Sequence, residues 1–231
     1  PSSFRCMLLG GSGASSGLLE RAKSKYVPVF QSYGMTETSS QIVTLSPDNA
    51  LKKIGSSGKS LFPASVEIRD QGSDGIGEIY VKGPMVTSGY YNNESATQEA
   101  IKNGWLRTGD LGYMDGEGFL YVVDRRKDLI ISGGENIYPS EIEAVLLRID
   151  GIKEAAVAGM DDDEWGKVPF ACVVGDESKV SREYILYRLK ASLASFKVPK
   201  KIIFVPSLPR NSSRKILRKS LLTYVKQKKM V

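Results

Sequence analysis

The chain of 231 residues contains no histidine and only two cysteines. Without histidine, neither a Ser-His-Asp triad nor a Cys-His pair can form, and most zinc sites are excluded. No apolar run approaches the roughly 20 residues of a membrane-spanning helix, so we expect no membrane span. Cys6 and Cys172 lie far apart in the sequence, which favours a reduced cytoplasmic protein, although a disulfide between them stays open.

Positive charge is in excess towards the C-terminus. Residues 1–124 carry 11 basic and 13 acidic side chains, whereas residues 125–231 carry 21 and 13, and no acidic residue follows Glu183. Such a basic region is typical of proteins that bind phosphate groups, either on nucleic acid or on a small molecule. A solvated basic tail explains the same charges equally well, so charge alone does not decide between these interpretations.

The first 124 residues predict an α/β unit followed by antiparallel strands. The apolar run after Arg5 predicts a buried strand, residues 16–24 have helical spacing, and residues 27–30 predict a second strand. This strand–helix–strand order indicates an α/β arrangement. From about residue 60 the pattern changes to short alternating runs, which predict an antiparallel, barrel-like region. Its expected strands include Ser65–Arg69, Glu78–Lys82 and Phe119–Val123.

Residues 125–231 predict a compact α+β domain. A strand at 128–131 leads into Gly133-Gly134, and a helix follows that begins near Pro139, with Ser140 and Glu143 spaced as a capping box. The change in composition near Arg125 indicates a domain junction. The expected further elements are the apolar helix face Ile142, Val145, Leu146 and Ile149, buried strands at 155–158, 168–174 and 202–205, an amphipathic helix at 181–193, a loop at 206–214 and a basic helix at 216–226.

The first predicted strand ends in a glycine-rich turn, Gly10-Gly11-Ser12-Gly13. Gly11, Gly13 and Gly17 are spaced one residue too widely for a dinucleotide-binding fingerprint, and no lysine follows that would form a P-loop. A tight turn at the carboxyl end of a strand still faces the ligand side of an α/β sheet. Gly10 and Gly11 are therefore candidate nucleotide-binding residues.

Six motifs follow one another along the chain: Tyr33–Glu37, Gly77–Gly83, Arg107–Gly112, Asp124–Asp128, Gly133–Glu143 and Asn211–Arg218. Together they resemble the adenylate-forming superfamily of acyl-CoA synthetases, peptide-synthetase adenylation domains and luciferases. One short motif would be weak support because such matches often occur by chance, but six in the right order are specific. Within the superfamily, residues 33–44 and 208–218 most resemble the ligases for o-succinylbenzoate in bacterial menaquinone synthesis.

The resemblance implies a reaction in two steps. A small-molecule carboxylic acid attacks the α-phosphate of ATP to give an acyl-adenylate and pyrophosphate, and the thiol of coenzyme A then displaces AMP. ATP, Mg²⁺ and coenzyme A are the expected cosubstrates, and no prosthetic group is expected. Because the first step brings two anions together, it requires positive groups and Mg²⁺ near the phosphates.

The resemblance also implies a division of the chain. Residues 1–124 would be the C-terminal part of a large ATP- and acyl-binding domain, and residues 125–231 a mobile C-terminal domain with a hinge at 125–128. The superfamily places its Ser/Thr/Gly-rich phosphate loop N-terminal to the motifs found here, and residues 1–231 contain no such loop ending in lysine. We therefore expect the chain to be truncated at its N-terminus, and we expect it alone neither to adenylate an acid nor to bind ATP tightly.

Three residues of the first motif acquire roles from the resemblance. Glu37 resembles the Mg²⁺-binding carboxylate, a hard oxygen donor suited to that ion. Thr36 resembles the hydroxyl that binds phosphate, and Tyr33 resembles the ring that lies against adenine. Taken alone, the same residues fit a surface turn with a helix-capping threonine and a buried tyrosine.

Two further residues resemble ribose contacts. Asp110 resembles the carboxylate that accepts hydrogen bonds from both ribose hydroxyls, which requires an ionised and rigid acceptor. Arg125 resembles a second ribose contact at the start of the next domain. A β-turn at Thr108-Gly109-Asp110 is the alternative interpretation of this motif.

In the second region, Lys215 resembles the catalytic lysine that contacts the α-phosphate and the substrate carboxylate, a task suited to a mobile ammonium. Arg214 stands where the family usually has glycine. Lys127 resembles the hinge residue, which must absorb a large φ/ψ change. Gly133 and Gly134 resemble the glycines that line the pantetheine channel, where a side chain would block the thiol. The expected nucleotide-binding residues are therefore Gly10, Gly11, Tyr33, Gly34, Thr36, Asp110, Arg125 and Lys215.

Two alternatives stay open at this point. A ligase for a fatty or another aryl acid would carry the same motifs, because the acyl pocket is built largely from segments N-terminal to these. A nucleic-acid-binding module would use the basic C-terminal half, but it leaves Thr36, Glu37 and Asp110 unexplained, and no basic stretch interleaved with aromatic residues occurs. We therefore expect no nucleic-acid partner. A homo-oligomer stays possible.

Overall fold

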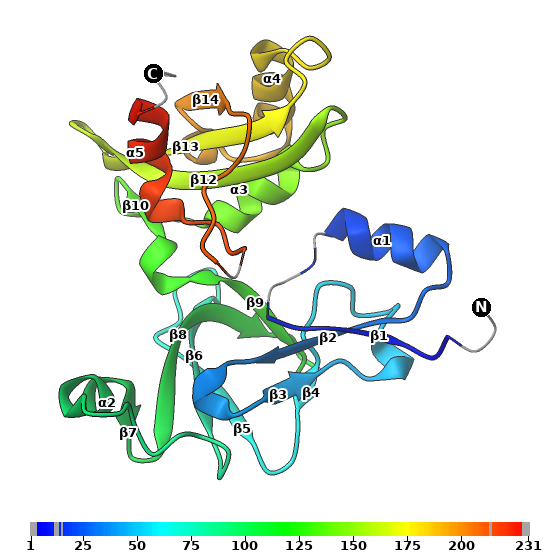
Figure 1. Cartoon of the computed structure of the whole chain (residues 1–231), viewed down its shortest axis with the longest axis vertical. Helices are drawn as coiled ribbons and strands as arrows, with labels where there is room; N and C mark the ends of the chain where they lie inside the picture. The colour runs from blue at the N-terminus through cyan, green and yellow to red at the C-terminus, as the bar shows by residue number, and fades with distance from the viewer. Residues whose placement is uncertain (1–3, 12–13, 15, 213, 228–231) are drawn as a thin grey trace. The chain divides into compact units, whose positions relative to one another are not determined.

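The computed structural model describes residues 4–11, 14, 16–212 and 214–227 of the chain (Figure 1). The chain divides into two compact units, residues 1–126 and residues 127–231. Ser12 and Gly13 of the glycine turn and Ser213 of the last motif lie outside the described residues. Among the described residues, no helix is long and apolar enough to cross a membrane.

The first unit begins with a four-stranded sheet of order β1-β2-β3-β4. Strands β1 and β2 are parallel, with helix α1 between them in the chain, which confirms the predicted strand–helix–strand unit. The prediction that β1 is buried is wrong, because Met7 and Leu8 are 46% and 51% exposed. Among the described strands, β1 pairs with β2 alone and lies at the edge of the sheet, so it has few neighbours to cover it. The elements are β1 (Met7–Leu9), α1 (Ser16–Ser24), β2 (Val29–Gly34), β3 (Gln41–Thr44) and β4 (Lys59–Ser60), with 3-10 turns η1 (Thr36–Thr38) and η2 (Pro47–Asn49).

Five antiparallel strands form the second sheet of this unit, as the alternating pattern predicts. They pair in the order β5-β6-β8-β7, and β9 pairs with β8 as well, so the described strands form an open path rather than a ring. Both sheets contribute to one core, in which Ile42 and Val43 of the first sheet pack with Ile79, Val81 and Leu106 of the second. The elements are β5 (Ser65–Arg69), β6 (Gly77–Lys82), α2 (Glu94–Ala100), β7 (Ile101–Lys102), β8 (Trp105–Met114) and β9 (Leu120–Arg125).

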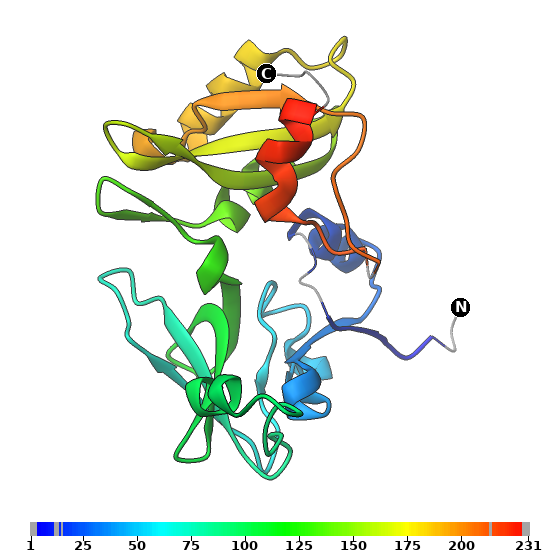
Figure 2. The ribbon, with the colours of Figure 1, turned by 60° about the vertical axis from the view of Figure 1, so that its left-hand side comes forward.

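The second unit is an α+β domain around the sheet β12-β13-β14. Because side chains alternate along a strand, Val157 and Val173 face a core shared with helices α3 and α4, whereas Phe170 and Cys172 face the core that includes α5. Figure 2 shows α5 lying across this sheet. The elements are η3 (Arg126–Asp128), β10 (Ile130–Ser132), β11 (Glu135–Ile137), α3 (Pro139–Leu146), β12 (Ile152–Asp162), β13 (Gly166–Gly175), α4 (Arg182–Ser192), η4 (Ser195–Lys197), β14 (Lys201–Phe204), η5 (Arg218–Ser220) and α5 (Leu221–Gln227).

The predicted capping box of α3 is wrong. Pro139 occupies the first helical position, so Tyr138 becomes the N-cap and Ser140 lies inside the helix. Glu143 points elsewhere: its Oε1 atom accepts a hydrogen bond from the backbone N–H of Val157 at 2.9 Å. The apolar face of this helix is as predicted, since Ile142, Leu146 and the following Ile149 are buried.

Three element boundaries differ from the prediction for local reasons. The strand expected from residue 128 begins at Ile130, because η3 occupies residues 126–128. The last helix begins at Leu221 rather than at Ile216, since Ile216 forms a β-bridge with Arg210 and η5 intervenes. The strand expected at 27–30 begins at Val29.

Both cysteines are free thiols. Cys6 is exposed, whereas Cys172 lies in the core of the second unit. Burial raises the pKa of the Cys172 thiol to about 11, because the thiolate would lose its hydration. The disulfide that the sequence left open is therefore not formed.

Candidate functional site

A buried carboxylate, Asp110, is the centre of a polar cluster in the first unit. It lies on β8 directly opposite Arg125 of β9. Its Oδ2 atom accepts a hydrogen bond from the Tyr33 hydroxyl at 2.8 Å, and its Oδ1 atom lies 2.8 Å from Nε of Arg125. Only 4% of Asp110 is exposed. The structure thus brings together three predicted site residues from β2, β8 and β9.

A β-bulge in β8 positions Asp110. The register between β6 and β8 shifts between Glu78 and Tyr80, and at this point Gly109 has a φ of +73°, a conformation that glycine adopts at little cost. The Thr108 hydroxyl donates to the carbonyl of Ile79 at 2.7 Å and accepts from the backbone N–H of Asp110 at 3.1 Å. The Thr-Gly-Asp motif therefore forms an irregular strand segment rather than the alternative β-turn.

Tyr33 has a contact that the sequence did not reveal. Its ring packs in the core with Ile42 and Ile79, and its hydroxyl reaches Asp110. Burial, and after it the negative charge of Asp110, raises the pKa of the Tyr33 phenol above its ordinary value. The phenol therefore stays protonated and donates to the carboxylate. The general rule that a buried tyrosine hydroxyl needs a partner predicts that a partner exists, but it does not identify the residue.

The Thr36-Glu37 segment forms the short turn η1 after β2. Thr36 is exposed, and the half-buried Glu37 accepts a hydrogen bond from the Tyr90 hydroxyl at 3.0 Å. The pKa of Tyr90 is raised, mainly by desolvation and then by its bond to Glu37. Among the described residues, no group of three or more His, Cys, Asp or Glu side chains could hold a metal ion. Glu37 would thus supply one carboxylate to an ion that takes its other ligands from phosphate and water, which is a common arrangement for Mg²⁺.

Thr38 holds this turn in place and was missed by the sequence reasoning. Its buried hydroxyl accepts from the backbone N–H of Met35 at 3.0 Å and lies 2.8 Å from the carbonyl oxygen of Ser40. Gly34 is needed for a steric reason, because a Cβ atom there would lie 2.2 Å from that same carbonyl oxygen. The close return of the chain after β2 therefore explains both residues.

A second buried carboxylate, Glu78 on β6, also escaped the sequence reasoning. It is 1% exposed, and its Oε1 and Oε2 atoms lie 2.9 Å from Nε of Arg107 and 3.1 Å from Nη1 of Arg126. The pKa of Arg107 is raised, chiefly by its hydrogen bond to Glu78. Arg125 and Arg126, the last two residues of the first unit, are thus each paired with a buried carboxylate.

We expect Glu78→Gln to lower the free energy of unfolding of the first unit by about 1–3 kcal/mol, because two guanidinium groups lose their counter-charge. Urea unfolding followed by Trp105 fluorescence in a Trp165→Phe background measures this. Glu67→Gln is the matched control: its ion pair with Arg69 is exposed and should contribute less than about 1 kcal/mol. If both variants lose the same free energy of unfolding, the ion pairs of Glu78 contribute no more to stability than an exposed ion pair.

Gly10 and Gly11 follow β1, as predicted. A Cβ atom at Gly10 would lie 3.0 Å from the Ser32 hydroxyl oxygen, and Gly11 has a φ of +79°. Packing against Ser32 therefore favours glycine at position 10, and the backbone conformation favours it at position 11. Their role in nucleotide binding stays a prediction.

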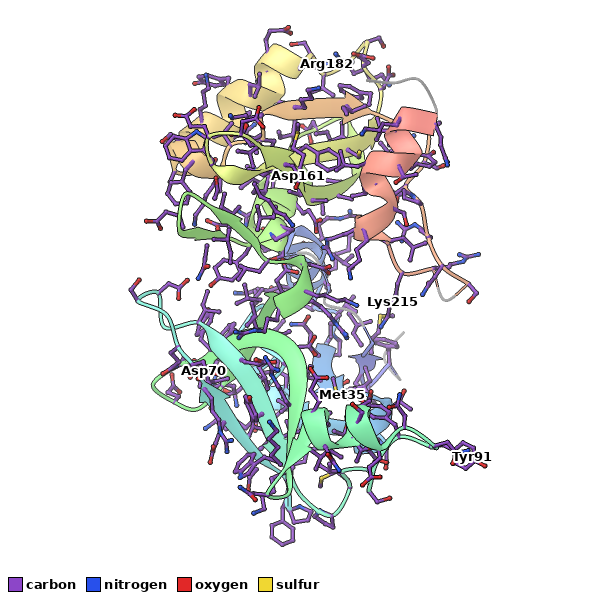
Figure 3. The ribbon with its side chains drawn as sticks, turned by 90° about the vertical axis from the view of Figure 1, so that its left-hand side faces the viewer. Met35, Asp70, Tyr91, Asp161, Arg182 and Lys215 are labelled. Carbon is purple, nitrogen blue, oxygen red and sulfur yellow. The ribbon has the colours of Figure 1, made fainter. Side chains whose placement is uncertain are left out.

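In the second unit, Lys215 lies in an exposed loop between β14 and η5 (Figure 3). The loop closes where Arg210 forms an antiparallel bridge with Ile216, and the backbone N–H of Lys215 donates to Oδ1 of Asn211 at 2.8 Å. Arg214 has a φ of +62°, in the left-handed region that favours glycine. This backbone conformation is one that the glycine expected here from the resemblance would adopt at little cost.

Gly133 and Gly134 form the two-residue turn of the β10–β11 hairpin, with φ values of +57° and +90°. Positive φ at both positions defines a turn for which glycine is strongly favoured. A Cβ atom at Gly133 would lie 2.6 Å from the Trp165 ring, whereas one at Gly134 would meet nothing within 4 Å. Open space beside Gly134 is compatible with the predicted channel role. Lys127, the predicted hinge residue, is exposed within η3.

Two family models match the chain: AMP-binding enzyme over residues 1–91 and AMP-binding enzyme C-terminal domain over residues 141–215. The chain belongs to the AMP-binding enzyme family. The first family match contains the Thr36-Glu37 turn, and the second ends at Lys215. The resemblance that the six motifs indicated is thus confirmed.

Individual relatives agree with this assignment. The 2-succinylbenzoate–CoA ligase of Oceanobacillus iheyensis is 58% identical over 223 residues, which are 96% of this chain and 46% of that ligase. The chain therefore spans about half the length of the curated relatives it matches. A solved structure of o-succinylbenzoate CoA synthetase from Bacillus subtilis with its acyl-adenylate intermediate matches with a TM-score of 0.90 and 54% identity, covering 96% of this chain and 46% of that chain.

A second structure of the Bacillus subtilis synthetase, a double mutant bound to a product analogue, matches over the same 96% of this chain and 46% of that chain, again at 54% identity. Its TM-score is only 0.54.

Proposed function

We propose that this chain is the C-terminal part of an AMP-forming acid–CoA ligase whose acid substrate is o-succinylbenzoate. The observation that carries the proposal is the high identity to 2-succinylbenzoate–CoA ligases over nearly the whole chain. The geometry of the first unit supports it, because Asp110, Tyr33 and Arg125 form a rigid polar cluster of the kind that a nucleotide ribose requires. ATP, Mg²⁺ and coenzyme A are the proposed cosubstrates.

Asp110 is suited to bind the ribose hydroxyls of ATP. The Tyr33 hydroxyl and the Arg125 guanidinium each occupy one of its oxygens, which holds the carboxylate ionised and in one orientation. A carboxylate can accept several hydrogen bonds, so the ribose hydroxyls would bind Asp110 beside these partners. Arg125, half exposed beside Asp110, would contact the same sugar.

The η1 turn is suited to the phosphates. Thr36 presents an exposed hydroxyl, and the turn that carries it is fixed by the buried Thr38. Glu37 would hold Mg²⁺, which when bound neutralises phosphate charge and so favours attack by an anionic carboxylate. Tyr90, which donates to Glu37, orients this carboxylate.

Lys215 supplies the remaining positive charge for the first step. Its ammonium, at the end of an exposed loop, would contact the α-phosphate and the attacking carboxylate as negative charge develops between them. A preorganised charge of this kind stabilises the transition state more than the separated substrates.

The hinge proposal for Lys127 follows from the two residues before it. Ion pairs with Asp110 and Glu78 hold Arg125 and Arg126 on the first unit. The next residue along the chain is Lys127, whose side chain is exposed. A φ/ψ change concentrated at one or two residues is how hinged domains rotate.

Pyrophosphate release tests the proposed function. The assay uses the extended protein, which contains this chain preceded by an N-terminal part that brings it to the length of the relatives. It is given ATP, Mg²⁺ and one of three acids: o-succinylbenzoate, benzoate or decanoate. We expect o-succinylbenzoate to give the highest rate by about 100-fold or more, because a matched pocket discriminates against acids that leave its polar groups unpaired. Release with decanoate or benzoate alone would favour the other ligases. Salt-sensitive polynucleotide binding without pyrophosphate release would favour a nucleic-acid-binding module.

A further inference from the structure

We propose that Arg218 and Glu143 are positioning residues that fix the Lys215 loop, and that they act on adenylation through this loop. This inference rests on the proposed function, because it assumes that Lys215 acts in the first half-reaction. The two residues lie 75 positions apart in the sequence, on η5 and α3 of the second unit. Neither contacts the reacting atoms in the proposed mechanism.

The internal bonds of the loop fix its shape but not its attachment. The backbone N–H of Leu217 donates to the carbonyl of Pro209 at 2.9 Å, and the N–H of Arg214 donates to the carbonyl of Asn211 at 2.9 Å. With the bond from the Lys215 N–H to the Asn211 side chain, these contacts form a compact turn. Every one of them joins two residues of the loop itself. Apolar packing holds the ends of the loop, because Leu208 is buried in the core on the α5 side of the sheet and Ile216 packs against it, but this packing does not orient the turn as a bidentate polar contact does.

Arg218 attaches the C-terminal arm of this loop to the rest of the second unit. Its Nε and Nη2 atoms lie 3.1 and 2.7 Å from the two oxygens of Glu143, a bidentate pair that fixes both distance and orientation. Glu143 is in turn held by the backbone N–H of Val157 on β12. Because Lys215 is three residues before Arg218, this chain of contacts ties the lysine backbone to the central sheet.

The other arm of the loop has a weaker tie. Arg210 pairs with Glu154, but both side chains are more exposed, at 38% and 40%, than those of Arg218 and Glu143, at 22% and 12%. Exposed ion pairs contribute little because water competes for both charges. Of the two ion pairs on the loop arms, the Arg218–Glu143 pair is therefore the stronger tie.

Arg218 also lies near the proposed hinge segment. Its Nη1 atom is 3.6 Å from Oδ2 of Asp128, the residue that follows Lys127. One guanidinium thus contacts both the anchor of the catalytic loop and the segment next to the hinge. This arrangement keeps Lys215 in a defined place relative to the start of the second unit.

The first experiment measures the two half-reactions in the protein extended to the length of the relatives. Arg218→Met should slow pyrophosphate release by about 10- to 100-fold, since small misplacements of a catalytic group cost rates of this order. Thioester formation from pre-made acyl-adenylate should change less than about twofold. Glu143→Gln should behave like Arg218→Met, and the double variant should be no worse than either, because both remove one interaction.

Matched controls separate position from charge. Lys219→Met removes an exposed positive charge next to Arg218 and should leave both half-reactions within about threefold. Arg218→Lys keeps the charge but cannot form the bidentate pair, so its rate should fall between those of the wild type and Arg218→Met. This milder variant also keeps the proposal testable if Arg218→Met does not fold.

The second experiment uses the 231-residue chain and does not depend on activity. In Arg218→Lys and Glu143→Gln, amide hydrogen exchange of residues 210–217 should be faster by about tenfold, while exchange in β12 and β13 stays unchanged. Unchanged exchange in the loop, or equal slowing of both half-reactions, would overturn the positioning role. If the wild-type extended protein releases no pyrophosphate, the proposed function fails instead, and the exchange result still decides whether the pair anchors the loop.

Discussion

Lys215→Ala should lower acid-dependent pyrophosphate release by at least about 100-fold in the protein extended to the length of the relatives, roughly the effect of removing one well-placed charge contact from a transition state. The same variant, given pre-made acyl-adenylate, should form thioester at close to the normal rate. The reason for the split is the proposed rotation about Lys127, which would carry the lysine out of the site before the thiol attacks. Single-turnover assays of each half-reaction measure both rates.

Lys219→Ala provides the matched control for Lys215→Ala. Lys219 is also an exposed lysine in the same basic segment, but it lies beyond the loop turn, in η5. We expect it to affect neither half-reaction by more than about threefold. Equal damage to both half-reactions in Lys215→Ala would mean that Lys215 is structural, and the rotating-domain mechanism would then lose its main support in this chain.

Lys127→Pro should have the opposite effect. Proline fixes φ near −65° at the proposed pivot, so the chain cannot make the backbone change that rotation requires. We expect thioester formation from pre-made acyl-adenylate to fall by about 100-fold or more, while pyrophosphate release changes only a few-fold. Lys127→Ala, which removes the side chain but leaves φ free, should change neither rate by more than about twofold.

The hinge assignment would be contradicted by either of two results. If Lys127→Ala reduces thioester formation as strongly as Lys127→Pro, the lysine side chain matters rather than the backbone freedom. If Lys127→Pro leaves thioester formation intact, the pivot lies at another residue. Circular dichroism of both variants verifies that the fold is retained.

Elements whose signals are local in sequence were predicted well. Helix α4 begins after Ser181, whose side chain accepts from the backbone N–H of Tyr184, and it ends at Ser192, close to the predicted limits. Strands β12 and β13 cover the predicted buried runs, and apolar residues along them alternate between two cores, as at Ala156 and Val157. The Ser181 cap and the alternation along these strands depend on neighbours within a few residues, so the sequence alone was enough to predict them.

Predictions failed where a distant contact competes with a local signal. Ser140 and Glu143 have the spacing of a capping box, but the Glu143 carboxylate binds Val157 and Arg218 instead. The apolar run at β1 predicts burial, but burial depends on what covers the strand, and β1 has only β2 beside it among the described strands. Neither outcome can be derived from residues within one turn or one strand.

The sequence by itself determined the family, the order of the motifs and the identity of candidate residues such as Thr36, Glu37 and Lys215. Only the tertiary structure decided which polar side chains come into contact. Tyr33 and Asp110 are 77 residues apart and Glu143 and Arg218 are 75 apart, yet each pair is in hydrogen-bond contact. The physical reason is that a buried carboxylate must find a donor, while strand register and the path of the chain determine which donor lies within reach.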